Sequence, residues 1–339
     1  MKAFKYLVTI ALLMTFGFLS SFTQNAEADD FSMRLTTDTP DVMPQGMAAV
    51  WFGEEVEKRL PGAEVKIFNA SSLYNNADSL EAMHAGTLEA CWATLSKISG
   101  IIKQGLCLRT PTLFSSYEQV QKIPETGIGE AIAAAAEDKG FIVLGWGNVS
   151  PYIGVGARER ILITDDWKGK KVRIYEKDTQ MVMVKMLGGN PIVMPWGEFV
   201  PSVQSGVVDA GFTSLGSWGP VKETLPYFTS IGLIPDYYVF MVAKRWWDKL
   251  PSETREVVAA VAKEAGRKQM AMQFEKDQAD LRKFKAADPS QPGFHLLAGE
   301  QLEVYKKIWL KPVGEVIEKK IGKDGKPLLE LAEKLSKEL

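Results

Sequence analysis

Residues 166–209 have the sequence DWKGKKVRIYEKDTQMVMVKMLGGNPIVMPWGEFVPSVQSGVVD, in which short apolar strands alternate with helical runs. The pattern predicts a strand over 171–175, with Val172 and Ile174 on one face and Arg173 on the other. A helix over 181–187 should end at the following glycine pair, because glycine adopts a positive φ without steric cost. A strand at 192–194, a helix at 196–203 and a further strand that ends at Asp209 complete the stretch. This order is typical of a layered α/β domain.

Two parts of the stretch resemble one family, the DctP family of TRAP-transporter solute-binding proteins. DWKGKKVR is similar to its "DlKGlKiR" signature, and LGGNPIVMPWGEFVPSVQSGVVD to its "lGanptpmpfsEvytaLqtGvvDg". With weaker matches on both sides, the resemblance covers residues 31–325. It implies a two-lobed α/β fold of the periplasmic-binding-protein-like type II, with a ligand cleft between the lobes and a long lobe-bridging helix. It also implies capture of a small organic anion outside the cytoplasmic membrane.

The N-terminus has the three regions of a secretory signal peptide. Lys2 and Lys5 precede an uncharged, mostly apolar run over 6–18, and Ala26-Glu27-Ala28 is an A-x-A cleavage site. The apolar run is shorter than the ~20 residues of a membrane-spanning helix, which favours cleavage over anchoring. We therefore expect residues 1–28 to be removed near Ala28 and the mature chain to be periplasmic, with no membrane insertion.

Composition limits the possible partners. A chain of 339 residues that is 46% hydrophobic can bury a large core and form two lobes. A net charge of −2 argues against nucleic acid or an anionic membrane surface as a partner. The only two cysteines, Cys91 and Cys107, could pair in an oxidising compartment, but their apolar surroundings favour buried free thiols.

The chain is expected to cross between the lobes twice. Lobe I should comprise 29–150 and 238–278, lobe II 151–237 and 279–325, and 326–339 should form a C-terminal tail helix. The glycine-dotted segment 145–156 contains two G-x-G pairs, but neither continues as G-x-G-x-x-G into a helix. A hinge or turn is therefore expected there, where the first crossing lies, and not a nucleotide-binding loop. The apolar segment 237–243 should return to lobe I, followed by a long helix that begins near Ser252.

Polar residues follow the predicted strands of lobe I. Asp38, Asn76 and Thr94 lie just beyond the carboxyl ends of three strands, which is where ligands bind in sheets of this kind. The segment FNASSLYNNADSLEAMHAGTLEA resembles the family's "fpaSqLgsdre" region, and this resemblance places the same positions in the cleft.

Arg173 is the main candidate for ligand binding. Its phase is opposite to that of Val172 and Ile174, so it faces either the cleft or the solvent, where it could pair with Glu176 or Asp178. A guanidinium offers a planar fork that matches a carboxylate. The resemblance implies that this arginine clamps the ligand carboxylate. It also implies that Trp196 lies against the ligand, although a tryptophan at this point, taken by itself, more often belongs to the core.

The chain departs from the family pattern at several positions, and these departures bear on the identity of the ligand. Tyr152 stands where members that bind polyhydroxylated acids have a second arginine, Thr213 where they have asparagine, and Thr94 where an acidic residue is common. A pocket with fewer polar partners should reject a ligand rich in hydroxyl groups. The aromatic residues that could line it are Trp92, Phe212, Trp218 and Tyr237. We therefore expect a monocarboxylate with an apolar or aromatic tail, such as an aryl or indolyl acid or a 2-oxo acid.

The sequence contains little that suggests catalysis. His84 and His295 are far apart, neither belongs to a cluster with metal-ligand spacing, and common nucleophile and phosphate-binding motifs are missing. We expect no enzyme activity, no cofactor and no metal. By resemblance, the partners are the small and large membrane subunits of a TRAP transporter. A ligand-sensing receptor for a signalling system and a secreted enzyme on the same fold stay open as alternatives.

Overall fold

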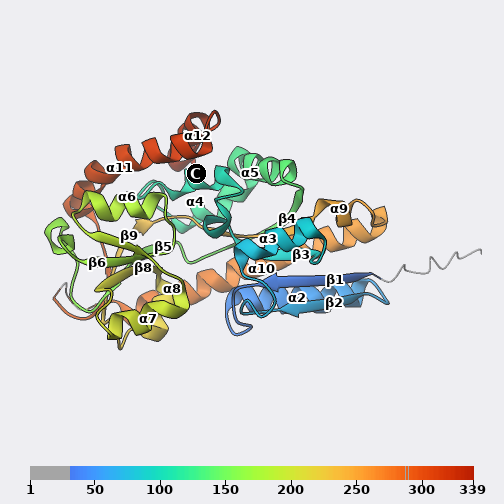
Figure 1. The fold of residues 1–339 in the computed structure, drawn as a ribbon, viewed down its shortest axis with the longest axis horizontal. Helices are drawn as coiled ribbons and strands as arrows, with labels where there is room; N and C mark the ends of the chain where they lie inside the picture. The colour runs from blue at the N-terminus through green and yellow to red at the C-terminus, as the bar shows by residue number, and fades with distance from the viewer. Residues whose placement is uncertain (1–30, 287, 289) are drawn as a thin grey trace, which may run out of the picture.

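The computed structural model describes residues 31–286, 288 and 290–339, which form an α/β protein with two sheets (Figure 1). The predicted signal peptide, 1–28, lies outside the described residues. Within the described part of the chain, no helix combines the length and the apolar character needed to cross a bilayer.

The first sheet defines what we call the first lobe. Its strand order is β2-β1-β3-β10-β4, and only β10 runs antiparallel to its neighbours. The strands are β1 (Ser32–Thr37), β2 (Glu64–Phe68), β3 (Ala90–Thr94), β4 (Phe141–Asn148) and β10 (Tyr237–Ala243). The segment predicted to return to this lobe, 237–243, is therefore a strand inside its sheet.

The second sheet defines the second lobe, with the order β11-β9-β5-β8-β6-β7 and β5 as its reversed strand. Its strands are β5 (Tyr152–Ala157), β6 (Lys171–Ile174), β7 (Asn190–Val193), β8 (Ala210–Ser214), β9 (Tyr227–Leu233) and β11 (Gly293–Leu296). The prediction of a strand ending at Asp209 was wrong, because β8 begins one residue later. The Asp209 carboxylate instead accepts a hydrogen bond from the Lys171 amide at the start of β6, 2.7 Å away.

Helices flank both sheets, and one of them runs past both lobes. They are α2 (Pro44–Arg59), α3 (Asn76–Ala85), α4 (Tyr117–Lys122), α5 (Gly127–Asp138), α6 (Thr179–Met186), α7 (Trp196–Gln204), α8 (Leu215–Trp218), α9 (Lys244–Trp247), α10 (Ser252–Phe284), α11 (Gly299–Ile321) and α12 (Gly325–Glu338). Figure 1 shows α10, with 33 residues, extending from the first lobe to the second, as expected for a lobe-bridging helix. The residue numbers proposed for the lobe boundaries stay predictions.

The two crossings between the lobes lie side by side. The amide of Val149 donates to the Asp236 carbonyl at 3.0 Å, and the amide of Ile234 donates to the Pro151 carbonyl at 2.9 Å. Each crossing leads into the reversed strand of the next sheet, so the parallel strands of both sheets direct their carboxyl ends toward this junction. In such sheets, the carboxyl ends are where ligands bind.

The glycine-dotted segment 145–156 contains the first crossing between the sheets, as expected, but its four glycines lie in the strands β4 and β5 and not in a turn. Gly145 lies in β4, and a Cβ there would come within 2.6 Å of the Ala262 carbonyl oxygen of α10. Gly266 of α10 would in turn place a Cβ 2.3 Å from the Trp146 carbonyl oxygen. These glycines allow a helix and a strand to touch backbone to backbone, a close approach that only glycine permits.

Cys91 and Cys107 are both free thiols, in agreement with the preference for unpaired cysteines. Both are buried, and burial raises the pKa of each to about 12. They are therefore unreactive core residues at neutral pH.

Candidate functional site

Strand β6 orients Arg173 by its alternation. Val172 and Ile174 lie in the hydrophobic core, and Arg173 is on the opposite face, where it is 3% exposed. Its Nε donates to the Met194 carbonyl at 2.9 Å, and its Nη1 donates to the Phe212 carbonyl at 2.7 Å. Two main-chain oxygens therefore hold the guanidinium in one orientation.

The charge of Arg173 has no carboxylate partner among the described residues. The alternative of a surface ion pair is wrong, because Glu176 accepts hydrogen bonds at the start of α6 and Asp178 pairs with Lys320 at 2.6 Å. Within the described part of the chain, Nη2 of Arg173 has no hydrogen-bond partner. Burial lowers the pKa of Arg173 from 12.5 to about 10, so the side chain is still protonated at neutral pH.

Three aromatic rings surround this guanidinium. Its Cζ lies 5.2 Å from the ring centre of Tyr175, 5.4 Å from that of Phe199 and 5.7 Å from that of Trp196. Phe199 is buried, whereas Trp196 is 39% exposed and is not a core residue. Aromatic faces stabilise a cation but leave its hydrogen-bonding edge free for an anion.

A glycine in strand β8 leaves the space that the side chains of Arg173 and Phe199 occupy. Gly211 is the β8 residue paired with Arg173, and a Cβ there would lie 2.5 Å from the Phe199 ring and 2.9 Å from the Cβ of Arg173. Thr213 lies two residues further along β8, on the same face, and is buried. The structure therefore brings Arg173, Trp196 and Thr213 to one end of the second sheet.

A second polar group forms at the carboxyl ends of the strands in the first lobe. Asn76 donates from Nδ2 to the Asp38 carboxylate at 2.7 Å, and its Oδ1 accepts from the Thr94 amide at 2.9 Å. Lys97 and the hydroxyl of Tyr238 also donate to Asp38. Burial alone would raise the pKa of Asp38, but these donors outweigh it and lower that pKa. The three predicted residues of this lobe lie together around a satisfied carboxylate.

Tyr237 lies apart from this group. It is fully buried, and its hydroxyl donates to the Val120 carbonyl at 2.6 Å. The next residue, Tyr238, is the one whose hydroxyl reaches Asp38, because neighbouring residues of a strand point to opposite faces. We therefore leave Tyr237 out of the proposed site. The other aromatic residues expected to line the pocket are also fully buried core side chains: Trp92, Phe212 and Trp218.

Tyr152 stands at the start of β5, beside the first crossing. Its ring centre lies 6.3 Å from that of Tyr117 and 6.1 Å from that of Phe294, and it packs against an apolar cluster of the second lobe. The structure thus places Tyr152 among aromatic neighbours near the junction of the lobes, away from the guanidinium of Arg173.

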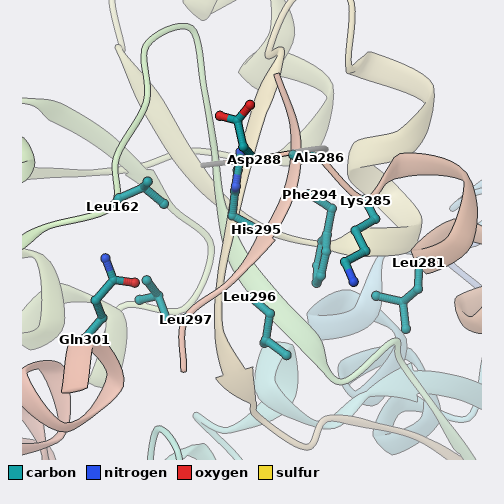
Figure 2. A pocket seen from close by; sticks show the side chains of 10 residues that line it. All are labelled: Leu162, Leu281, Lys285, Ala286, Asp288, Phe294, His295, Leu296, Leu297 and Gln301. Atoms are coloured by element: carbon teal, nitrogen blue, oxygen red, sulfur yellow. The ribbon is translucent and has the colours of Figure 1, made fainter. Parts of the chain in front are cut away.

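A cavity of about 400 Å³ lies between the lobes. Its walls include Lys97 and Leu106 from one side and Tyr175 and Val193 from the other. A larger cavity of about 570 Å³ lies among the end of α10, β11 and the start of α11, and Figure 2 shows its lining side chains. No residue predicted for the site lines either cavity. The inter-lobe cavity is the better candidate because it is bounded by Tyr175, whose ring lies beside Arg173, and by Lys97, which donates to Asp38.

Sequence reasoning missed several residues of the cleft. Tyr175 is two positions after Arg173, so strand alternation could have identified it, and Phe199 is one helical turn after Trp196. Arg109 gave no signal in the sequence, because its partners are remote: Nη2 donates to the Tyr175 hydroxyl at 3.1 Å and Nη1 lies 3.5 Å from the Asp236 carboxylate.

The described residues contain no cluster of three or more histidine, cysteine or acidic side chains that could hold a metal ion. The two histidines bind main-chain carbonyls, His84 that of Lys139 at 2.6 Å and His295 that of Gln291 at 2.9 Å. What the cleft offers is therefore a fixed cationic anchor, aromatic surface and hydrogen-bond donors, which suit the binding of an anion.

Two α/β lobes joined by adjacent crossings, with polar groups at the facing strand ends, define a two-lobed binding protein of the periplasmic type. Residues 35–317 match the family model of the bacterial extracellular solute-binding proteins, family 7 (DctP). The chain belongs to this family.

Individual relatives agree with this assignment. A solute-binding protein of Chromohalobacter salexigens is 28% identical over 278 residues, which are 79% of this chain and 80% of the relative. The structure is similar to that of a TRAP periplasmic solute-binding protein from Sulfurospirillum deleyianum with bound succinate, with a TM-score of 0.79, 22% identity and coverage of 90% of this chain and 99% of that one. A TRAP periplasmic solute-binding protein from Ralstonia eutropha with bound (S)-2-acetolactate gives a TM-score of 0.79, 20% identity and coverage of 91% and 99%.

Proposed function

We propose that this protein is the periplasmic receptor of a TRAP-type secondary transporter and binds a small organic monocarboxylate with an apolar or aromatic tail. Arg173 holds the carboxylate, Trp196 lies against the ligand and Thr213 completes the wall beside them. Tyr152 borders the cleft at the junction of the lobes, away from the carboxylate. Asp38, Asn76 and Thr94 close the cleft from the first lobe. The protein needs neither catalysis nor a cofactor for this role.

The observation that carries the proposal is the buried guanidinium of Arg173. A buried charge without a counterion is unfavourable, and it is found where a ligand supplies the missing charge. Two main-chain carbonyls fix the fork and leave Nη2 free, so a carboxylate can bind without rearrangement. Each charge-assisted hydrogen bond contributes about 1.5–3 kcal/mol.

The tail is proposed from the walls of the cleft. Tyr175 and Trp196 bring two aromatic faces within 6 Å of the anchor, and neither is fully buried. In the first lobe, the Asp38 carboxylate is already bound by Lys97, Asn76 and Tyr238. Only the Thr94 hydroxyl of this group has no partner among the described residues. Few polar atoms are thus free for a chain of hydroxyl groups, and unpaired buried hydroxyls would weaken binding.

Binding is proposed to occur by hinge closure at the two crossings and along α10. The ligand shifts the equilibrium only through its preference for the closed form, in which both lobes contact it. The closed receptor then docks on the membrane subunits of the transporter. Removal of the signal peptide near Ala28 would release the mature protein into the periplasm.

A thermal-shift screen of organic acids tests the proposal. At a concentration of 100 times its Kd, a ligand adds about 2.7 kcal/mol of stability, which raises the melting temperature by about 5 °C. Aryl, indolyl and 2-oxo monocarboxylates should produce this shift, and mass spectrometry should identify one of this class in the purified protein. A screen in which only sugar acids or C4-dicarboxylates raise the melting temperature would refute the proposed ligand class.

A further inference from the structure

Tyr175 occupies a position between two arginines at the end of β6. Its ring centre lies 5.2 Å from the Cζ of Arg173, and its hydroxyl accepts a hydrogen bond from Nη2 of Arg109 at 3.1 Å. It also lines the cavity of about 400 Å³ between the lobes. The same side chain therefore touches the proposed carboxylate anchor, a buried cation and the ligand space.

Arg109 is fixed independently of any ligand. It is 2% exposed, its Nη1 donates to the Pro235 carbonyl at 3.2 Å, and it pairs with the Asp236 carboxylate at 3.5 Å. Asp236 is itself held by the amide and hydroxyl of Ser96. These contacts hold the Arg109 guanidinium in one orientation, with Nη2 directed at the Tyr175 hydroxyl.

The main chain of Tyr175 is fixed as well. Its amide donates to Oε1 of Gln180 at 3.1 Å, and the same oxygen accepts from the Glu176 amide at 3.2 Å. The carboxylate of Glu176 in turn binds the first amides of α6. The phenol is therefore held at both ends, by its backbone and by its hydroxyl.

The hydrogen bond from Arg109 determines what the Tyr175 hydroxyl can do. A phenol has one proton to donate, and its oxygen already accepts from a cation. Within the described residues the proton of Tyr175 has no acceptor. A hydroxyl that accepts a charge-assisted hydrogen bond becomes a stronger donor. An acceptor oxygen of the ligand could therefore receive the Tyr175 proton.

We infer that Tyr175 is a specificity-determining residue, which donates a hydrogen bond to a second ligand oxygen on the carbon next to the carboxylate. The ligand is then a 2-oxo or 2-hydroxy acid, with its carboxylate on Arg173 and its C2 oxygen on Tyr175. This inference rests on the proposed function and narrows its ligand class. An acid without the C2 oxygen leaves the polarised hydroxyl unpaired in the closed cleft, which weakens binding about tenfold or more.

Matched pairs of ligands test the inference. Isothermal titration calorimetry compares phenylpyruvate with 3-phenylpropanoate and indole-3-pyruvate with indole-3-propanoate, which differ only in the C2 oxygen. The wild-type protein should bind the 2-oxo acid of each pair at least about tenfold more tightly. Tyr175→Phe should reduce this preference to within about threefold, mainly by weakening the 2-oxo acid.

Tyr227→Phe is the matched control, because Tyr227 begins β9 at the opposite end of the same sheet and should leave the preference unchanged. The melting temperature of each free variant shows that it folds. A wild-type preference that persists in Tyr175→Phe overturns the inference, as does a wild type that binds both acids of each pair equally.

The two proposals fail in different ways. If Arg173→Met abolishes binding of both acids while Tyr175→Phe keeps the wild-type preference, the carboxylate anchor stands and only the role of Tyr175 is refuted. If Arg173→Met binds all four acids as tightly as the wild type, or the wild type binds none of them, the proposed ligand class fails and this inference falls with it.

Discussion

Replacing Arg173 by methionine should separate ligand binding from stability. Nη2 offers two N–H groups to a carboxylate, and charge-assisted hydrogen bonds of about 1.5–3 kcal/mol each make the anchor worth about 3–6 kcal/mol. Arg173→Met should therefore weaken binding of the best acid from the screen by at least about 100-fold.

The same substitution should change the stability of the free protein very little. The lowering of the Arg173 pKa from 12.5 to about 10 corresponds to about 3 kcal/mol against the buried charge, and methionine relieves this penalty. Against this, the carbonyls of Met194 and Phe212 lose their donor, at about 1–3 kcal/mol each. These terms oppose each other, so the free energy of unfolding should change by between about +1 and −3 kcal/mol, with a loss of about 1 kcal/mol as the central value.

Replacing Arg109 should have a much larger effect on stability, because Arg109 is as buried as Arg173 but pairs with the Asp236 carboxylate. Arg109→Met leaves the Asp236 carboxylate buried without its cation and should destabilise the protein by about 3–5 kcal/mol. Denaturant unfolding of both free variants and calorimetric titration of Arg173→Met provide the measurements. The reasoning is refuted if Arg173→Met binds the acid as tightly as the wild type, or if it destabilises the protein as much as Arg109→Met.

Substitutions at three further positions test other parts of the structure. Gly211→Ala places a Cβ 2.5 Å from the ring of Phe199 and 2.9 Å from the Cβ of Arg173. The substitution should therefore lower the melting temperature and weaken acid binding together. Wild-type affinity in calorimetric titration would contradict this. Trp196→Ala should weaken binding of an aromatic acid about tenfold with little loss of stability, because the side chain is partly exposed. Trp196→Phe should keep most of the wild-type affinity. A large fall in the melting temperature of Trp196→Ala would instead indicate a packing role. Burial raises the pKa of Asp277 on α10 from 3.8 to about 6, so the stability associated with its protonated form is lost as the pH rises through 6. Between pH 5 and 7.5 the wild type should lose about 1–2 kcal/mol more than Asp277→Asn in urea unfolding, and parallel pH profiles would show that this carboxyl does not titrate there.

The sequence predicts those features of the fold that depend on local periodicity. Alternation along 171–174 places Val172 and Ile174 in the core and Arg173 on the other face, and the apolar run over 237–243 matches the bounds of β10. It does not specify which face of β10 meets the cleft. Tyr237 and Tyr238 are both aromatic, and a shift of one residue exchanges their roles.

Features set by distant partners could not be predicted. The glycine pairs of 145–156 resemble a turn in sequence, and only packing with distant segments explains them. The pair in β4 lies against α10, whereas Gly154 in β5 lies against the backbone of β9. The role of Arg109 depends on Tyr175, 66 residues away, and on Asp236 beyond the first crossing. No local pattern contains that information, because the contacts exist only once the two lobes are formed.

The order of strands in the first sheet also has a consequence for biosynthesis. β10 lies between β3 and β4, yet the ribosome makes almost the entire second sheet before it reaches residues 237–243. Until then the nascent first lobe lacks the strand that joins its two parts, and pairing between segments so distant in the chain is slow. The first sheet can therefore be completed only late in translation, so the first lobe cannot reach its final fold while only its N-terminal part has been made.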